Sequence, residues 1–230
     1  MSDPRLIVAL DVPTRAAAEA MVETLGEAVS FYKIGLQLLA TGGMEMAADL
    51  KARGRSVFLD WKLHDIGATV EKAAAAIAAT GAGDLLTVHA QPQVLRAAVK
   101  GCAGSGLKVL GVTVLTSLSG QDLGEIGYGL GVEQLVDRRI RQALEAGADG
   151  VVASPHEAAL ARRIGGPDFL VVTPGVRPEW AGADDQARAA TPAEALRNGA
   201  SHLVCGRPVT AAKDPRAAAE RIAREMAAAA

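Results

Sequence analysis

The sequence predicts an α/β protein that folds as one domain, a (β/α)₈ TIM barrel spanning residues 1–230. Short runs rich in Val, Leu and Ile recur eight times, alanine-rich stretches with helical spacing lie between them, and one turn pattern is repeated. Strands that alternate with helices in this way pair in parallel. Eight such units in 230 residues come close to the usual ~250 residues of this barrel.

Each apolar run is short and bounded by turn residues, which is typical of a strand that is buried on both faces. The predicted strands are LIVALD (6–11), FYKIG (31–35), VFLDWK (57–62), LLTVHA (85–90), KVLGVTVLTS (108–117), GVVAS (150–154), FLVVTPGVR (169–177) and HLVCGR (202–207).

The repeated turn pattern occurs in AATGAGDLLTV, LEAGADGVVA and LRNGASHLVCG. In each, a helix end is followed by Gly-Ala, one or two small or polar residues, and a strand. The glycine suits the left-handed position that ends a helix, and the loop is short, as αβ connections usually are. An open doubly wound sheet is the alternative fold. It usually carries a glycine-rich turn after its first strand, where this chain has LDVPTR.

Composition points to a small-molecule partner. The net charge is only −2 and the aromatic content 3%, so neither a nucleic-acid-binding surface nor a base-stacking platform is expected. No apolar run reaches the ~18 residues that a membrane span needs. Cys102 and Cys205 are not in a CxxC pair, and we expect free thiols in a reducing compartment, the cytoplasm.

Polar and charged residues gather where the predicted strands end. In a barrel of this kind the carboxyl ends of the strands and the loops after them form the active face. The residues predicted there are Asp11, Lys33, Asp60, Lys62, His89, Thr116, Ser154, Arg177 and Arg207.

The stretch DWKLHD (60–65) places two acids and a lysine at the end of a buried strand. Asp60 and Lys62 are two residues apart and share a face, Lys33 ends the neighbouring strand, and Asp65 follows in the loop or first helical turn. Together they can form an alternating, nearly neutral cluster. Neighbouring carboxylates keep an ammonium protonated, and such a lysine can stabilise a carbanion and give it a proton. A purely structural ion-pair network is the alternative.

The segments TPGVRP (173–178) and CGRPVT (205–210) follow the seventh and eighth strands, where these barrels commonly bind phosphate. Gly175 and Gly206 let backbone amides approach an anion, and Arg207 offers a fork that matches phosphate oxygens. Two tight turns with surface arginines are the alternative interpretation.

Between these segments runs a long polar loop, PEWAGADDQARAATP (178–192). Loops of this length are usually functional or disordered. We expect a lid over the phosphate, with Gln186 donating to it; simple disorder is the alternative. No HxH or HExxH spacing is present, and we predict no metal site.

Taken together, these motifs resemble the orotidine 5′-phosphate decarboxylase family in its bacterial form. DWKLHD carries the family's DxKxxD signature, and FYKIG, VTVLTS, TPGVRP and GRPVT match in order over nearly the whole chain. The resemblance implies a carboxy-lyase that converts orotidine 5′-monophosphate to uridine 5′-monophosphate without a cofactor. This reaction is the last step of de novo pyrimidine synthesis.

The resemblance also implies roles for individual residues. Lys62 would donate the proton to the pyrimidine carbon that loses carbon dioxide, and Asp60 would lie against the departing carboxylate. Lys33 would bridge Asp60 and the ribose hydroxyls, and Asp11 would bind the ribose.

Further roles follow from the same resemblance. In a homodimer, Asp65 and Thr69 would reach across the interface into the partner's site. Thr116, and with it Ser119, would contact the pyrimidine. The residues that would hold the phosphate are Gln186, Gly206 and Arg207, with Arg177 nearby.

Two other functions stay open. A magnesium-dependent sugar-phosphate decarboxylase or aldolase can use the same barrel and a similar motif, although an acid then replaces Lys33. A phosphate-binding barrel without catalysis would keep GRPVT and need no Lys62. The bottom-up chemistry reaches a barrel, a phosphate and a protonated carbanion, whereas the pyrimidine rests on the resemblance alone.

Overall fold

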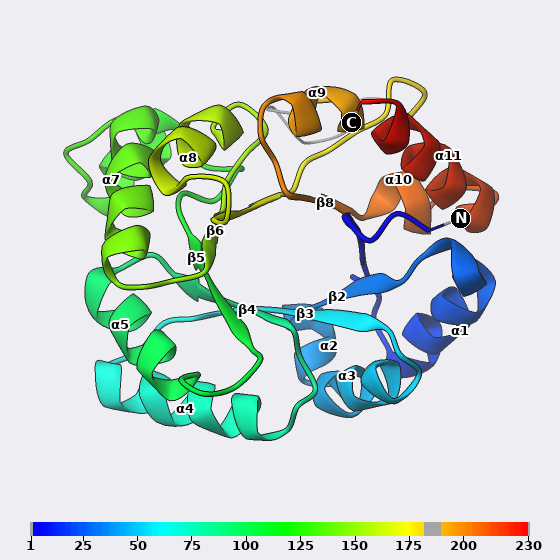
Figure 1. Ribbon diagram of the computed structural model, residues 1–230, viewed down its shortest axis with the longest axis horizontal. Helices are drawn as coiled ribbons and strands as arrows, with labels where there is room; N and C mark the ends of the chain where they lie inside the picture. Colours follow the sequence, from blue (N-terminus) through cyan, green and yellow to red (C-terminus); the bar gives the residue numbers. More distant parts are fainter. Residues whose placement is uncertain (1, 182–189, 230) are drawn as a thin grey trace.

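The computed structural model describes residues 2–181 and 190–229. Its strands all run parallel and close into a barrel in sequence order, because β1 pairs with both β2 and β8 (Figure 1). In the described residues the strands are β1 (Leu6–Ala9), β2 (Phe31–Gly35), β3 (Ser56–Leu63), β4 (Leu85–His89), β5 (Lys108–Val112), β6 (Gly150–Val152), β7 (Leu170–Thr173) and β8 (His202–Cys205). The predicted (β/α)₈ barrel is confirmed.

A ring of helices surrounds the strands, and each strand leads into one of them (Figure 1). The outer helices are α1 (Arg15–Leu25), α3 (Gly43–Ala52), α4 (Gly67–Ala79), α5 (Pro92–Gly101), α7 (Val132–Glu145), α8 (Ala158–Gly165), α9 (Pro192–Arg197) and α11 (Pro215–Ala228). No helix within residues 2–181 and 190–229 has the length and apolar character needed to cross a membrane.

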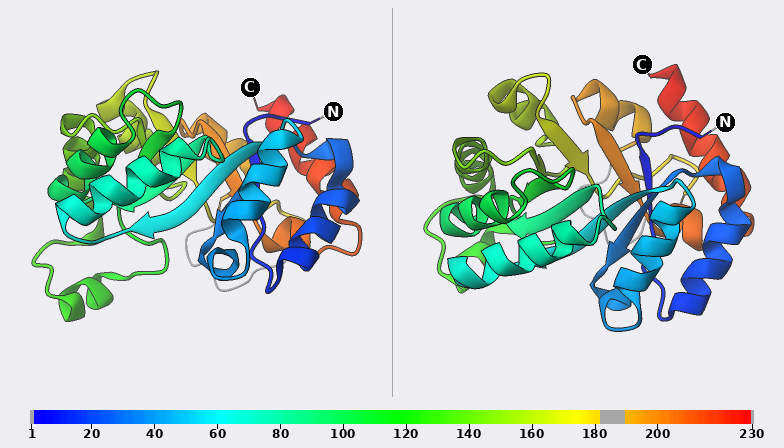
Figure 2. Two further views of the ribbon diagram at one scale, coloured as in Figure 1. Left: turned by 90° about the horizontal axis from the view of Figure 1, so that it is seen from below. Right: turned by 60° about the horizontal axis from the view of Figure 1, so that its bottom comes forward.

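Short helices lie in the connections. They are η1 (Gly26–Ala28), α2 (Leu36–Leu39), α6 (Gly120–Ile126) and α10 (Arg207–Thr210). Of these, α2, α6 and α10 follow strands, so they mark the end of the barrel where the strands finish, and α6 stands off the body there (Figure 2, left).

All the predicted strands form, but six of the eight end one to five residues earlier than the apolar pattern suggests. The run 108–117 ends at Val112, the run 150–154 at Val152 and the run 169–177 at Thr173. The apolar pattern continues beyond the end of β5, where Val114 is still buried although the residue no longer belongs to the strand. The expected position of Thr116 at a strand end is therefore wrong, and it lies in the β5–α6 connection.

The strands separate two apolar clusters. Alternate residues face outward and pack under the helices, while the others fill the barrel, because side chains on a strand point to opposite faces in turn. The inner cluster consists of Ile7, Ala9, Phe31, Phe58, Leu85, Leu110, Val172 and Val204.

The inner cluster explains where the site lies. On three adjacent strands an inward apolar residue is followed, two positions later, by a charged one: Ala9 by Asp11, Phe31 by Lys33 and Phe58 by Asp60. The apolar residues therefore close the barrel below, and the charges sit at its mouth.

The repeated turn pattern has the expected backbone. Gly81, Gly147 and Gly199 have φ of 63°, 77° and 97°, the left-handed conformation that glycine adopts most readily. The polar residue that follows each glycine also has a structural role that the pattern alone did not reveal. Its side chain accepts a hydrogen bond from an amide at the start of the preceding strand. These bonds are Val57 to Asp84 at 2.7 Å, Val109 to Asp149 at 2.8 Å and Val171 to Ser201 at 2.9 Å.

We predict that Asp84→Ala lowers the free energy of unfolding by about 1–3 kcal/mol, since a charged acceptor for a partly buried amide is lost. Asp84 also pairs with Lys51 at 2.6 Å. Urea unfolding would measure the change, with Asp168→Ala, an exposed aspartate before β7, as the matched control. Equal effects of the two substitutions would contradict the role given to Asp84.

Candidate active site

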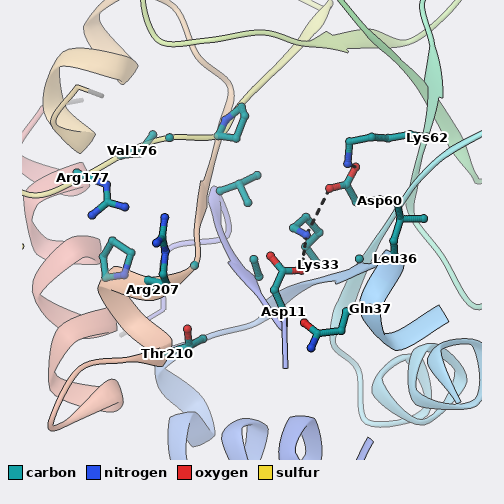
Figure 3. A pocket seen from close by; sticks show the side chains of 17 residues that line it. Asp11, Lys33, Leu36, Gln37, Asp60, Lys62, Val176, Arg177, Arg207 and Thr210 are labelled. Carbon is teal, nitrogen blue, oxygen red and sulfur yellow. Dashed lines mark hydrogen bonds and ion pairs between the residues drawn. The ribbon is translucent and has the colours of Figure 1, made fainter. Parts of the chain in front are cut away.

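A cavity of about 530 Å³ opens at the carboxyl ends of β1, β2, β3, β7 and β8. This volume lies within the ~300–1,000 Å³ that is usual for small-molecule pockets. Its polar side chains come from strand ends, short helices and connections on opposite sides of the barrel mouth (Figure 3). They are Asp11, Lys33, Gln37, Asp60, Lys62, Arg177, Arg207 and Thr210.

One wall of the cavity is a chain of alternating charges (Figure 3). Lys33 Nζ lies 2.9 Å from Asp11 Oδ1 and 3.3 Å from Asp60 Oδ2, and Lys62 Nζ lies 2.8 Å from Asp60 Oδ1. The side chains of Lys33 and Asp60 are only 9% and 14% exposed. Two acids and two bases make the set neutral, which offsets much of the cost of burying each charge.

Asp60 is the centre of this chain, and its pKa shows the balance of forces. Burial by itself raises the pKa of the Asp60 carboxyl. The charges of Lys33 and Lys62, with hydrogen bonds from Lys62 and Thr87, outweigh that effect and hold the pKa below its ordinary value. Asp60 is therefore ionised at neutral pH, which keeps a negative charge between the two ammonium groups.

The strand that carries Asp60 and Lys62 is not regular. The pairing of β3 with β4 shifts register between Leu59 and Leu63, and Lys62 has a φ of 49°. It is the one residue other than glycine with a positive φ among those that the structure describes. The two side chains meet as expected, but they do so across a bulge, which the sequence did not reveal. Strained backbone of this kind tends to occur at functional sites.

The opposite wall carries two arginines. Arg177 and Arg207 lie beside each other in the close-up, across the cavity from Lys62 (Figure 3). Gly175 turns the chain after β7 with a φ of 75°, and Gly206 precedes α10. Paired guanidinium groups beside two glycine turns suit an anion such as phosphate.

Asp65 does not join the charge chain of its own subunit. It is exposed, it accepts a hydrogen bond from the Ile66 amide at 2.6 Å, and it makes no ion pair with the described residues. The expected cluster of Lys33, Asp60, Lys62 and Asp65 is thus wrong for a single chain, where Asp11 provides the second acid. The DWKLHD backbone turns away after the bulge, and this carries Asp65 outward.

Four other predicted residues lie outside this cavity or outside the described residues. Thr69 is exposed on α4, and Thr116 does not line the cavity. Gln186, and with it most of the expected lid, falls within 182–189, outside the described residues. Ser119, which was grouped with Thr116, caps α6 through a capping box with Asp122.

Sequence reasoning missed Gln37, Thr210 and Thr87. Gln37 comes from the short helix α2, which the sequence did not predict, and Thr210 lies in α10, at the end of the CGRPVT segment. Thr87 could have been noticed, because it is the one polar residue between the aliphatic residues of LLTVH and stands on the strand next to DWK.

Two carboxylates, Asp11 and Asp60, face the cavity, and each is paired with a lysine. Within residues 2–181 and 190–229, no three His, Cys, Asp or Glu side chains come together as a group that could hold a metal ion.

Comparison with known proteins gives a consistent match. Residues 4–222 match the model of the "Orotidine 5'-phosphate decarboxylase / HUMPS family". An orotidine 5′-phosphate decarboxylase of Caulobacter sp. (strain K31) is 67% identical over 226 residues, 98% of each chain. One of Methylobacterium radiotolerans is 54% identical over 229 residues, 99% of each chain. The crystal structure of orotidine 5′-phosphate decarboxylase from Lactobacillus acidophilus superposes with a TM-score of 0.86 at 37% identity, covering 97% of this chain and 99% of that one.

We predict that Gly35→Ala breaks the outer end of the charge chain. A Cβ at Gly35 would lie 2.6 Å from Asp11 Oδ1 and 3.0 Å from Lys33 Nζ, so one of the two must move. The Asp11–Lys33 contact should lengthen beyond hydrogen-bonding distance in a crystal structure, because the displaced atoms are the ends of side chains that can swing aside. Gly120→Ala is the control, because a Cβ there meets nothing within 4 Å. An unchanged contact at 2.9 Å would contradict the prediction.

Proposed function

The chain belongs to the orotidine 5′-phosphate decarboxylase / HUMPS family, and from this premise we propose how its cavity performs the reaction. The reaction is the decarboxylation of orotidine 5′-phosphate in pyrimidine synthesis, and the protein is a carboxy-lyase. The observation that carries the mechanism is the position of Lys62 Nζ, 2.8 Å from the partly buried Asp60, on the wall that faces the arginine pair.

The two walls of the cavity define how the substrate lies. Its phosphate is held by Arg207 and the Gly206 turn, with Arg177 beside them, because among the described residues this wall presents the two guanidinium groups that line the cavity. The pyrimidine then reaches the charge chain, and the ribose hydroxyls lie between, next to Asp11 and Lys33. Binding the remote phosphate fixes the reacting carbon beside Lys62 and converts part of that binding energy into orientation.

Lys62 supplies the proton. When the bond between the ring carbon and the carboxylate breaks, carbon dioxide leaves and its electron pair stays on the ring carbon. The Lys62 ammonium stabilises that negative charge and then transfers its proton to the carbon, which gives uridine 5′-phosphate. Solvent returns a proton to the lysine. The reaction drawn in this way uses no cofactor.

Asp60 has two functions in this scheme. Its ionised carboxylate orients the Lys62 ammonium before the reaction. It also lies next to the place where the substrate carboxylate departs, so repulsion between the two negative groups favours loss of carbon dioxide. The size of that ground-state effect is contested in general, whereas the orienting role follows directly from the 2.8 Å contact.

The remaining roles follow the family pattern. Thr116 contacts the pyrimidine from the β5–α6 connection, and Gln186 donates to the phosphate. Lys33 binds ribose hydroxyls while it bridges Asp11 and Asp60.

The active unit is a homodimer in this proposal. Asp65 and Thr69 are exposed at the start of α4, and Ile66 between them is 68% exposed, an unusual position for a large apolar side chain. A partner subunit that covers this segment would receive Asp65 beside its own Lys62. The alternating array would then gain a second acid on the far side of the lysine.

We place the protein in the cytoplasm. Cys102 and Cys205 are both buried and unpaired, as expected in a reducing compartment. Burial raises the pKa of Cys102 to about 11 and that of Cys205 to about 12, so both thiols stay protonated and unreactive at neutral pH.

Turnover of orotidine 5′-phosphate in the presence of EDTA tests the assigned chemistry. It can be followed by ultraviolet absorbance and by release of carbon dioxide. We predict rapid conversion by the wild-type protein and a loss of about 10²- to 10⁴-fold in kcat for Lys62→Ala, with much ligand binding retained. Lys72→Ala, an exposed lysine on α4, is the control. A requirement for magnesium with sugar-phosphate turnover would favour the related aldolase chemistry, and intact function in Lys62→Ala would indicate a binding protein.

Mixing two inactive variants tests the shared site. We predict that Lys62→Ala and Asp65→Ala chains are each inactive alone. After unfolding and refolding together they should recover about a quarter of the wild-type activity, because a heterodimer has one site with both residues intact. No recovery from a folded mixed dimer would show that Asp65 does not act across the interface.

A further inference from the structure

Thr87, at the middle of β4, lies beside the charge chain but does not line the cavity. It is fully buried, with 0% of its surface exposed. Its neighbours Leu86 and Val88 point outward under the helices, whereas Leu85, on the same face as Thr87, belongs to the cluster inside the barrel. A hydroxyl in this apolar interior needs hydrogen-bond partners.

Both partners of the Thr87 hydroxyl belong to the catalytic pair. Its Oγ1 accepts a hydrogen bond from the Lys62 backbone amide at 3.0 Å and donates one to Asp60 Oδ1 at 3.0 Å. The same carboxylate oxygen receives Lys62 Nζ at 2.8 Å. A closed ring of contacts therefore links the backbone of Lys62, the hydroxyl of Thr87 and the carboxylate of Asp60.

The bulge in β3 explains why such a ring is needed. The ladder between β3 and β4 is regular up to Leu59 and resumes at Leu63, so the amide of Lys62 has no strand partner. Lys62 also has a left-handed backbone, with a φ of 49°, which a lysine adopts only when its surroundings impose it. The Thr87 oxygen satisfies the amide that the bulge leaves unpaired.

We propose that Thr87 is a positioning residue for the decarboxylation, because its hydroxyl fixes the Lys62 backbone and the Asp60 carboxylate relative to each other. This inference rests on the proposed function. Thr87 need not touch the substrate, since its effect reaches the reaction through the two residues that it holds. Its oxygen accepts the amide hydrogen, so its own hydrogen is free to point at the carboxylate.

A second effect of the Thr87 hydroxyl is electrostatic. A donor to the ionised carboxylate favours the charged form, and this contact is among the causes that hold the pKa of Asp60 low. Loss of the donor should raise that pKa toward its ordinary value. The acid limb of the kcat profile should then move to higher pH.

Packing is the competing explanation, and two substitutions separate it from positioning. Thr87→Val keeps the shape of the side chain and removes the hydroxyl, whereas Thr87→Ser keeps the hydroxyl and removes a methyl group. A packing residue would tolerate valine better than serine. A positioning residue would tolerate serine better than valine.

The experiment measures kcat, KM and the pH profile of orotidine 5′-phosphate decarboxylation. For Thr87→Val we expect a loss of about 10- to 100-fold in kcat, a KM within about threefold, and an acid limb at higher pH. Thr87→Ser should retain kcat within about threefold. Thr113→Val is the matched control: Thr113 is equally buried and its hydroxyl donates to the Val152 carbonyl at 3.0 Å, away from the catalytic pair.

A crystal structure of Thr87→Val gives a readout that does not depend on activity. We expect Lys62 to leave its left-handed conformation or its 2.8 Å contact with Asp60 to lengthen. If valine prevents folding, Thr87→Cys, which has a similar volume and a weak donor, should show the same loss of kcat.

Unchanged kcat in Thr87→Val, with Lys62 and Asp60 in place, would overturn the positioning role while leaving the proposed function intact. A larger loss in Thr87→Ser than in Thr87→Val would overturn it in favour of packing. No turnover by the wild-type protein would overturn the proposed function, and the positioning role with it.

Discussion

The ionised carboxylate of Asp60, held between two ammonium groups, is the interaction on which the site depends. A lone carboxylate at this depth would cost several kcal/mol and would take up a proton instead. Lys33 and Lys62 prevent this, because their ammonium groups lie 3.3 Å and 2.8 Å from the carboxylate. Because the pKa of Asp60 is lowered on folding, its stabilising contribution is fully present above the ordinary value of 3.8. That contribution is lost only as the pH falls through the lowered value.

The barrel is built so that this carboxylate can exist. Apolar residues such as Phe58 fill the interior, and the charges begin two positions further along the same strands. The bulge in β3 then turns Lys62 back toward Asp60, while it directs the following residues outward. One local irregularity therefore serves both Lys62, which we propose as the proton donor, and the exposed segment around Asp65, which we propose as part of a dimer interface.

The fold could be predicted almost completely from the sequence, because its signals are local. Apolar runs gave the eight strands, and glycines such as Gly147 gave the left-handed helix ends. The pairing of Asp60 with Lys62 followed from their spacing. The bulge could not be predicted, since a positive φ at a lysine has no sequence signature. The ion pair of Asp11 with Lys33 could not be predicted from the spacing either. The position of Thr116 was wrong because an apolar pattern shows burial and does not show where a ladder ends. What Asp65 contacts depends on a second subunit.

The protonation state of Asp60 can be measured directly. The carboxyl ¹³C resonance of this residue, assigned by comparison with Asp60→Asn, would be followed by NMR as the pH is lowered from 7. We expect the chemical shift of an ionised carboxylate to persist as the pH passes through 3.8, because the pKa is held below that value by Lys33 and Lys62. A protonated Asp60 at neutral pH, or a titration midpoint above 3.8, would show that burial outweighs the two ammonium groups and would contradict the assigned role of the charge chain.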